Sequence, residues 1–574
     1  MKRIRISLIA SLAVAALLAS CSGLDKMNKG AKDVSYSVNP PVLEAHAGKV
    51  NLDVTVQFPE KYFDKNVTFE ATPVLVYEGG ETAFPSYRVQ GENVDGNDKV
   101  ISNATGGSYT YSESVPYNEN MRVSDLVVRI KATKGSTTKE FEDYKIADGV
   151  ISTSELVASQ GAQAAIGEDA FQRIIAQSKA ADIFFLIQQA NIRGSELRKD
   201  EIAAIKAYMK EIKATDNINF KGIDISAYAS PDGPTDLNSK LATRREKVAK
   251  DYLAREMRKA KVEGGTDEAN YTLKNTPEDW EGFKAQMEAS NIQDKELILR
   301  VLSMYSDPEV REREIKNMSE TFSVIADEIL PKLRRSKISV NAEVIGKSDE
   351  EIAELAASNP SALNIEEILY AATLTEDVDE QLKIYNDAAA NFPKCWRAQN
   401  NIGVSKYIKG DLAGAKAAFT KANSIKGGVA EINNNLGVIA LREGDVAKAE
   451  EHFGAAAGAG AELDNNLGII SIYKGDYDAA IRYFGNSTNC NAALAKILAG
   501  KYDAALSTIN ANTVEVGFKY YLKAIVGART AESDMMFDSL RKACELDAKF
   551  KAAAATDMEF GKYFEDATFK SIIQ

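Results

Sequence analysis

The pattern of hydrophobic and polar positions divides the chain into regions of different structure. Between residues 34 and 150, apolar and polar positions alternate in short runs, clearest at 52–58, 67–77 and 126–130. Alternation with a period of two predicts half-buried β-strands, and turn clusters separate the runs. We therefore expect an all-β sandwich of immunoglobulin-like size at 34–150, acting as a spacer or docking module. Residues 151–180, rich in Ala, Ser, Gln and Gly, are expected to be a linker.

The next region, 181–347, alternates strand and helix patterns. A continuous apolar run at 183–187 predicts a strand buried on both faces. Helical spacing follows over 202–212, then a strand at 223–227, and then a helix to residue 253. This order predicts an α+β layer sandwich with successive strands side by side. An insertion-sized helical stretch between 258 and 336 precedes a last strand at 338–344.

Internal repeats begin in the third region, 348–574. Asn-Asn-Ile-Gly at 400–403 returns as Asn-Asn-Leu-Gly at 434–437 and 465–468, each time followed by Gly-Asp, Ala and Phe at matching distances. Gly403 and Gly437 are 34 residues apart, which is the tetratricopeptide period. We predict an all-α tetratricopeptide-repeat solenoid with a C-terminal helical cap. The concave groove of such a solenoid typically binds an extended peptide or a partner helix, so we expect envelope proteins to bind there.

Polar residues interrupt the apolar face of the helix that follows residue 234. Asn238 and Arg245 lie on the same side of it, two turns apart, beside a loop that runs from Ser230 to Gly233. A guanidinium next to loop N–H groups and a helix N-terminus is a typical arrangement for holding a small anionic ligand. The alternative is that Arg244 and Arg245 form a solvated helix face.

The same stretch resembles OmpA-like domains, which bind peptidoglycan. From Ala227 the chain reads A-Y-A-S-P-D-G-P-T-D-L-N-S-K-L-A-T-R-R-E, similar to the family pattern G-H-T-D-x-x-G-x-x-x-x-N-x-x-L-S-x-x-R-A. The residues that match in register are Gly233, Asn238, Leu241 and Arg245. The resemblance, to lipoproteins of the kind found in Bacteroidetes outer membranes, implies that Arg245 binds the carboxylate of diaminopimelate in a stem peptide, with Asn238 hydrogen-bonding nearby.

One position departs from the family pattern. The ligand-binding Asp of the family is Ser230 here, and Asp232, two residues on, is a candidate to take over the contact with the ligand amine. The substitution leaves open whether the domain still binds the cell wall. The peptidoglycan-binding residues that we predict are therefore Ser230, Asp232, Asn238 and Arg245.

The first residues resemble a bacterial lipoprotein signal. A basic head and an apolar run lead to Leu18-Ala19-Ser20-Cys21, which is similar to a lipobox. The resemblance implies removal of residues 1–20, acylation of Cys21, including palmitate, and a polar tether at 21–33. Ser22 favours the outer membrane, with a periplasmic body, and no second apolar stretch approaches the length of a spanning helix. The alternative is a plain secretory signal with Cys21 incidental.

The composition of the chain argues against several classes of binding and catalytic site. A net charge of −13 argues against a nucleic-acid surface, because no basic field would attract phosphate. The two histidines, His46 and His452, fall in different regions, so a histidine triad or a three-histidine metal site cannot be assembled within one domain. The cysteines of the repeats have no C-x-x-C spacing and are either paired or buried as free thiols; they are Cys395, Cys490 and Cys544. We expect no enzyme activity, cofactor or metal.

These observations lead to three functional hypotheses. The first is an outer-membrane lipoprotein that ties an envelope assembly to peptidoglycan and recruits a protein partner in the repeat groove. The second is an assembly factor or accessory subunit, of outer-membrane or fimbrial machinery, that binds only proteins because its OmpA-like domain no longer binds the wall. The third is a surface-displayed adhesin or fimbrial accessory.

Overall fold

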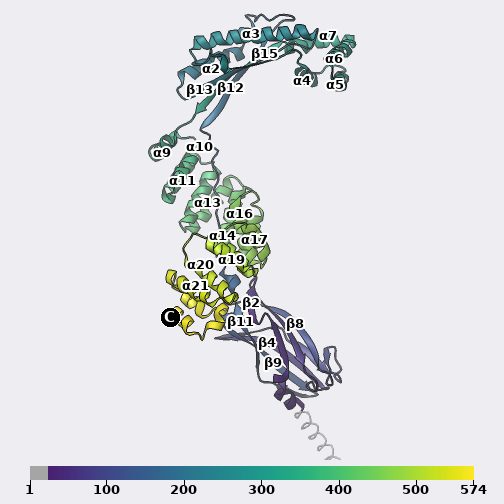
Figure 1. The fold of residues 1–574 in the computed structure, drawn as a ribbon, viewed down its shortest axis with the longest axis vertical. Coiled ribbons are helices and arrows are strands. Elements are labelled where there is room, and N and C mark those ends of the chain that lie inside the picture. Colours follow the sequence, from purple (N-terminus) through teal and green to yellow (C-terminus); the bar gives the residue numbers. More distant parts are fainter. Residues whose placement is uncertain (1–22) are drawn as a thin grey trace, which may run out of the picture. The chain divides into compact units, whose positions relative to one another are not determined.

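The computed structural model describes residues 23–574 and separates them into two units (Figure 1). One unit joins the chain up to Glu168 with Asp377–Gln574, and the other is Asp169–Glu376. The second unit is therefore an insertion between two parts of the first. Cys21 and the predicted signal lie outside the described residues. Among the described helices, none has both the length and the apolar character that crossing a membrane requires.

The N-terminal part of the first unit is rich in β-strands, as predicted. In β3 (Lys49–Phe58) every second residue is buried, which is the two-residue period read from the sequence. Strands β1, β2, β3 and β8 pair antiparallel, and a parallel pairing of β2 with β11 joins them to the rest. The other strands are β1 (Ser35–Asn39), β2 (Val42–His46), β4 (Val67–Tyr77), β5 (Gly80–Ala83), β6 (Tyr87–Gly91), β7 (Lys99–Ile101), β8 (Gly107–Pro116), β9 (Ser124–Lys134), β10 (Thr137–Glu140) and β11 (Tyr144–Ile151).

The described part of the predicted tether belongs to this β domain. Residues 23–29 are helical, and Leu24 and Met27 are only 1% and 2% exposed. Both side chains belong to the same apolar cluster as the strands. They are three residues apart, so a helical conformation places them on one face and lets them cover the core together.

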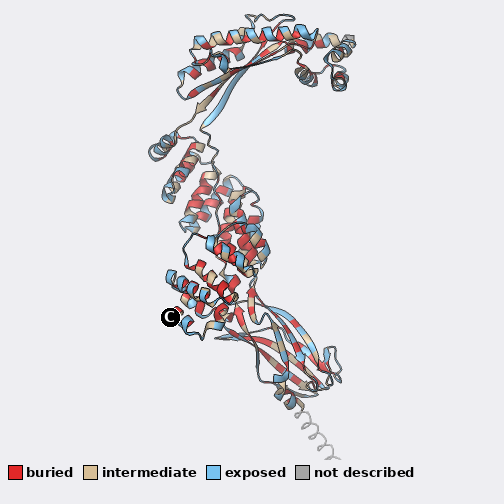
Figure 2. Cartoon of the chain, viewed as in Figure 1, coloured by how far each residue is buried: buried red, intermediate tan, exposed pale blue. Residues whose placement is uncertain are grey.

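The C-terminal part of the first unit is all-helical and confirms the predicted tetratricopeptide repeats. Successive antiparallel helix pairs stack, and Figure 2 shows the buried residues concentrated where they meet. A Cβ on Gly437 would lie 2.6 Å from the Phe453 ring, which explains why each repeat combines this glycine with this phenylalanine. The helices are α11 (Val378–Asn391), α12 (Trp396–Ile408), α13 (Leu412–Ile425), α14 (Ala430–Arg442), α15 (Val446–Gly454), α16 (Ala461–Tyr473), α17 (Tyr477–Phe484), α18 (Cys490–Leu498), α19 (Tyr502–Ala511), α20 (Gly517–Arg529), α21 (Ser533–Leu546), α22 (Lys549–Ala555) and α23 (Ala567–Ile573).

The second unit contains a four-stranded sheet in the order β12-β15-β13-β14. Helices α2 and α3 share an apolar cluster with its strands. An insertion of five short helices, α4 to α8, separates β14 from β15. The elements are β12 (Ile174–Phe184), α2 (Asp200–Ala214), β13 (Ile218–Tyr228), α3 (Thr235–Ala260), β14 (Tyr271–Thr276), α4 (Trp280–Glu288), α5 (Lys295–Met304), α6 (Pro308–Lys316), α7 (Ser319–Glu328), α8 (Leu330–Leu333), β15 (Arg335–Ile345), α9 (Asp349–Ser358) and α10 (Ile365–Ala371).

Two expectations for this unit were wrong. The first strand ends at Phe184, and the apolar residues after it, Leu186 and Ile187, are 44% and 54% exposed rather than buried. The first two strands also do not lie side by side, because β15 runs antiparallel between β12 and β13, whereas β13 and β14 do pair. The α2 crossover leaves a gap between the first two strands, and the last strand of the unit fills it.

Candidate functional site

Arg245, the central residue of the predicted ligand site, is completely buried, with 0% exposure. Its guanidinium donates hydrogen bonds to three backbone carbonyls: from Nε to Gln189 O at 3.0 Å, from Nη1 to Tyr228 O at 2.8 Å, and from Nη2 to Leu186 O at 3.2 Å. The group also lies over the Phe185 ring. Arg245 thus fixes the end of β13 and the segment after β12 against α3, and it is not part of a solvated helix face.

A second buried arginine lies close to Arg245. Arg334 is 8% exposed, and its Nε donates to Ser230 Oγ at 3.3 Å. Among the described residues, neither guanidinium has an ion-pair partner. Burial and the charge of Arg334 lower the pKa of Arg245 to about 10, and burial lowers the pKa of Arg334 as well. The Asp232 carboxylate opposes the effect of burial on the pKa of Arg334, although the two groups form no ion pair in the described part of the chain. Two poorly solvated positive charges beside a single carboxylate still favour an anion at this position.

The other predicted site residues hold the loop between β13 and α3. Asn238 Nδ2 donates to Gly233 O at 3.2 Å, and Ser230 is nearly buried under Arg334. Asp232 forms an ion pair with Lys316 at 3.0 Å. The structure therefore brings all four predicted residues to the N-terminal end of α3 or its loop, but within the described part no hydrogen bond joins Asn238 to Arg245.

Residues of the insertion contact this loop, which the sequence did not predict. The Glu312 carboxylate on α6 accepts a hydrogen bond from the Gly233 N–H and pairs with Lys316. On the other side of the loop, Thr235 Oγ1 donates to Glu278 at 2.8 Å. The Glu312 carboxylate thus accepts a hydrogen bond from a loop N–H group that we expected to bind an anionic ligand. The insertion contains no recognisable sequence motif, so its length was the only feature of the sequence that indicated a role at this loop.

The repeat groove carries a second candidate site, a ladder of asparagines. In three successive repeats the second asparagine of the Asn-Asn pair both accepts from the N–H and donates to the C=O of one residue in the predicted linker. All six N···O distances fall between 2.6 and 3.0 Å. The pairs are Asn401 with Gly167, Asn435 with Ala165, and Asn466 with Gln163. Bonding to every second residue means that the bound segment is extended.

The first asparagine of each pair reinforces the ladder. Asn400 donates to Ala165 O, Asn434 to Gln163 O, and Asn465 to Gly161 O. The rungs are also joined to one another, since Asn435 donates to Asn400 and Asn466 donates to Asn434, both at 2.9 Å. Asn491 extends the ladder to both backbone groups of Ala158. The repeated Asn-Asn pair was visible in the sequence as a repeat marker, but its binding role was not.

A segment of the chain itself occupies part of the repeat groove. Residues 158–167, which we call the strap, run along the ladder in place of a separate partner chain. The predicted linker at 151–180 is thus not a free connection: its first half is bound in the groove, and its end is already part of β12.

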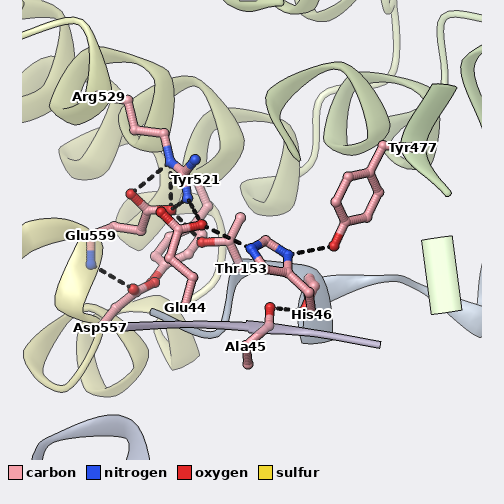
Figure 3. A network of polar contacts seen from close by, with 10 residues as sticks. Glu44, Ala45, His46, Thr153, Tyr477, Tyr521, Arg529, Asp557 and Glu559 are labelled. Atoms are coloured by element: carbon pink, nitrogen blue, oxygen red, sulfur yellow. Dashed lines mark hydrogen bonds and ion pairs between the residues drawn. The ribbon is translucent and has the colours of Figure 1, made fainter. Parts of the chain in front are cut away.

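A buried polar network joins the β domain to the last repeats (Figure 3). Arg529 pairs with Glu559 at 2.6 Å and with Glu44 of β2 at 3.5 Å. His46 Nδ1 lies 2.6 Å from the Tyr477 hydroxyl, and Thr153 bonds to Glu559. Burial raises the pKa of Glu559, which Arg529 opposes. The network fixes the start of the strap to the repeats.

The remaining candidate residues form no site in the described part of the chain. Cys395, Cys490 and Cys544 are free thiols, and burial raises the pKa of the last two. Burial lowers the pKa of His452. Over residues 23–574, no group of three or more His, Cys, Asp or Glu side chains is arranged to hold a metal ion.

Comparison with known proteins finds similarity only to solved structures; no protein family and no curated protein matches. A tetratricopeptide repeat protein from Parabacteroides merdae is 15% identical, with a TM-score of 0.28, over 43% of this chain and 98% of its own. The type IV pilus biogenesis factor PilW is 18% identical, with a TM-score of 0.26, over 39% of this chain and 98% of its own. PilF of Pseudomonas aeruginosa is 13% identical over the same shares, also with a TM-score of 0.26. The assignment of repeats rests on the helix pairs described above.

Proposed function

We propose that the chain is a non-enzymatic, lipid-anchored scaffold of an outer membrane that holds envelope proteins and contacts peptidoglycan through its α+β unit. The observation that carries this proposal is the buried pair of Arg245 and Arg334 beside the Ser230 loop. Removing two like charges from water costs free energy, and an anion between them would recover part of it. The carboxylates of a stem peptide supply such an anion.

The geometry leaves donors for this ligand. A guanidinium has five N–H groups, and Arg245 uses at least three of them on backbone carbonyls, so its capacity for a carboxylate is limited. The Arg334 side chain has a single hydrogen bond among the described residues, to Ser230. In this proposal Arg334 and Ser230 supply the main carboxylate contacts, Arg245 holds the site together, and Asp232 accepts from the ligand amine.

Co-sedimentation with insoluble peptidoglycan tests the wall-binding role. The soluble chain from Ser22 is compared with Arg334→Gln and Asp232→Asn, and with Arg244→Gln, which removes an exposed arginine from α3 and serves as the matched control. We expect the first two variants to release the chain from the pellet and the control to remain bound. Equal sedimentation of all four chains, with unchanged circular dichroism, would refute the role of the arginine site.

A second candidate, a scaffold that binds only proteins, is favoured by one observation: Glu312 already occupies the Gly233 amide, and Lys316 holds Asp232. The variant Glu312→Ala separates the two candidates. If the insertion merely covers a working site, the variant should sediment with peptidoglycan more strongly than the wild type. If neither chain sediments, the wall is not the ligand and the protein-only candidate stands.

The membrane anchor is tested separately. Incorporation of labelled palmitate in cells should depend on Cys21, with Cys21→Ser unlabelled and released from the outer-membrane fraction. Protease added to whole cells distinguishes a periplasmic body, which stays intact, from the surface-displayed adhesin, which is cleaved. Cleavage would favour the adhesin hypothesis over a periplasmic scaffold.

A further inference from the structure

We propose that the strap is an intramolecular ligand, and that the repeat groove binds an extended peptide of a partner protein when the strap leaves. The peptide would be uncharged, with small residues at the places of Ala162 and Ala165 and a glycine at the place of Gly167. This inference does not depend on peptidoglycan binding. It rests on the asparagine ladder and on the composition of the strap.

Recognition at the ladder goes through the backbone. The described hydrogen bonds from the Asn-Asn pairs to residues 161–167 end on main-chain N–H or C=O groups, at Gly161, Gln163, Ala165 and Gly167. Every non-proline residue offers these groups, so the ladder places no demand on the side chains of its ligand. A second chain in the same extended conformation therefore satisfies the same asparagines.

Side-chain size supplies the specificity. A Cβ on Gly167 would lie 3.0 Å from the Trp396 ring and 2.9 Å from Cγ of Arg397, so only glycine approaches Asn401 this closely. Ala162 and Ala165 are buried at 4% and 2% exposure, whereas Ile166 is 46% exposed. The groove thus accepts small residues inward and tolerates larger ones outward.

The strap is held by hydrogen bonds rather than by buried apolar surface. Its buried residues between 158 and 167 are only alanines and a glycine, so little apolar surface opposes its release. Water replaces its hydrogen bonds on opening, so the net loss for each bond is small. The segment just before the strap is fixed, since Ser154 Oγ donates to Ala45 O and Thr153 bonds to Glu559. Opening should therefore begin at Gly167.

The test uses a fluorescent peptide with the sequence of residues 157–168 and measures anisotropy with the soluble chain. Gly167→Val in the chain should open the strap, because the added side chain collides with Trp396. Ile166→Val, at the exposed neighbouring position, is the matched control. An intramolecular ligand acts at a millimolar effective concentration, so we expect the Gly167→Val chain to bind the peptide at least about tenfold more tightly than the wild type and the control.

Two further chains make the result specific. Asn435→Ala, added to Gly167→Val, should abolish the gain, and a peptide that itself carries valine at position 167 should not bind. Equal binding by wild type and Gly167→Val, or no binding by either, would overturn the proposal. A concentration-dependent dimer of the Gly167→Val chain would assign the groove to the strap of a second copy and would also overturn it.

Hydrogen exchange of the wild-type chain decides the matter if Gly167→Val fails to fold. The amides of Gln163, Ala165 and Gly167 should exchange by local opening, faster than the interior amides of α14 and α16. Exchange of the strap only together with these helices would mean that it never leaves the groove while the protein is folded, which is incompatible with a displaceable ligand.

Discussion

Asn435→Ala removes the middle rung of the ladder, and the structure allows its effect to be worked out. Asn435 is 0% exposed. Its Oδ1 accepts from Ala165 N at 2.6 Å, and its Nδ2 donates to Ala165 O at 2.8 Å and to Asn400 Oδ1 at 2.9 Å. The Ala165 carbonyl keeps its bond from Asn400, but the Ala165 N–H loses its partner. Asn435 Oδ1 also accepts from Asn434 Nδ2 at 3.1 Å. One buried unsatisfied amide costs about 1–3 kcal/mol and three lost bonds about 0.5–1.5 each, which gives about 2.5–7.5 kcal/mol.

The assay is urea unfolding followed by circular dichroism, with Asn433→Ala as the control on the same helix. Asn433 has an outward-facing bond to Ala455 O at 3.2 Å, so its loss should cost about 1 kcal/mol or less. If the strap detaches in Asn435→Ala, water satisfies Ala165 and the loss is limited to the free energy of strap opening. Equal unfolding midpoints for the two variants would refute the reasoning that the ladder stabilises the fold.

Three other predictions follow from buried groups. Arg245→Met removes a hydrogen bond from each of three backbone carbonyls, of which Leu186 O keeps another donor, the Gln189 N–H. The variant should lower the free energy of unfolding by about 3 kcal/mol or more in urea titrations, whereas Arg244→Met should change it by less than about 0.5 kcal/mol. Burial raises the pKa of the Asp557 carboxyl above its usual value of 3.8. The stability that this carboxyl contributes is therefore fully present below pH 3.8 and is lost as the pH rises through the pKa of the folded protein. In urea titrations at a series of pH values, the difference in free energy of unfolding between wild type and Asp557→Asn should fall over the same range. Leu24→Ala should lower the free energy of unfolding, measured by heat or urea, by about 2–5 kcal/mol if residues 23–29 belong to the β core. If these residues are only a tether, the free energy of unfolding should not change measurably.

Periodic features were predictable from the sequence because they follow from local geometry. Alternation in β3 matches its burial residue by residue, and the glycine and phenylalanine that mark each repeat in the sequence lie in close contact. The position of Arg245 on the buried face of α3 was also readable from helical spacing.

What the sequence did not show depends on contacts between distant segments. Ala165 and Asn435 are far apart in the chain, and no local pattern says that an Ala- and Gly-rich stretch will be bound rather than free. The same holds for Glu312 and Gly233. The apolar run at 183–187 failed for another reason: apolar residues are common on protein surfaces, so Leu186 and Ile187 carry no firm burial signal.

The strap also determines how the α+β unit is attached to the repeats. The chain enters that unit just after Gly167, which Asn401 of α12 holds, and returns at Asp377, just before α11, which packs against α12. Both connections therefore lie at the first repeats as long as the strap is bound. Release of residues 158–168 would free about eleven residues, or about 35 Å of extended chain, on the entering side alone. Occupation of the groove by a partner peptide would thus free the residues that directly precede the α+β unit in the chain.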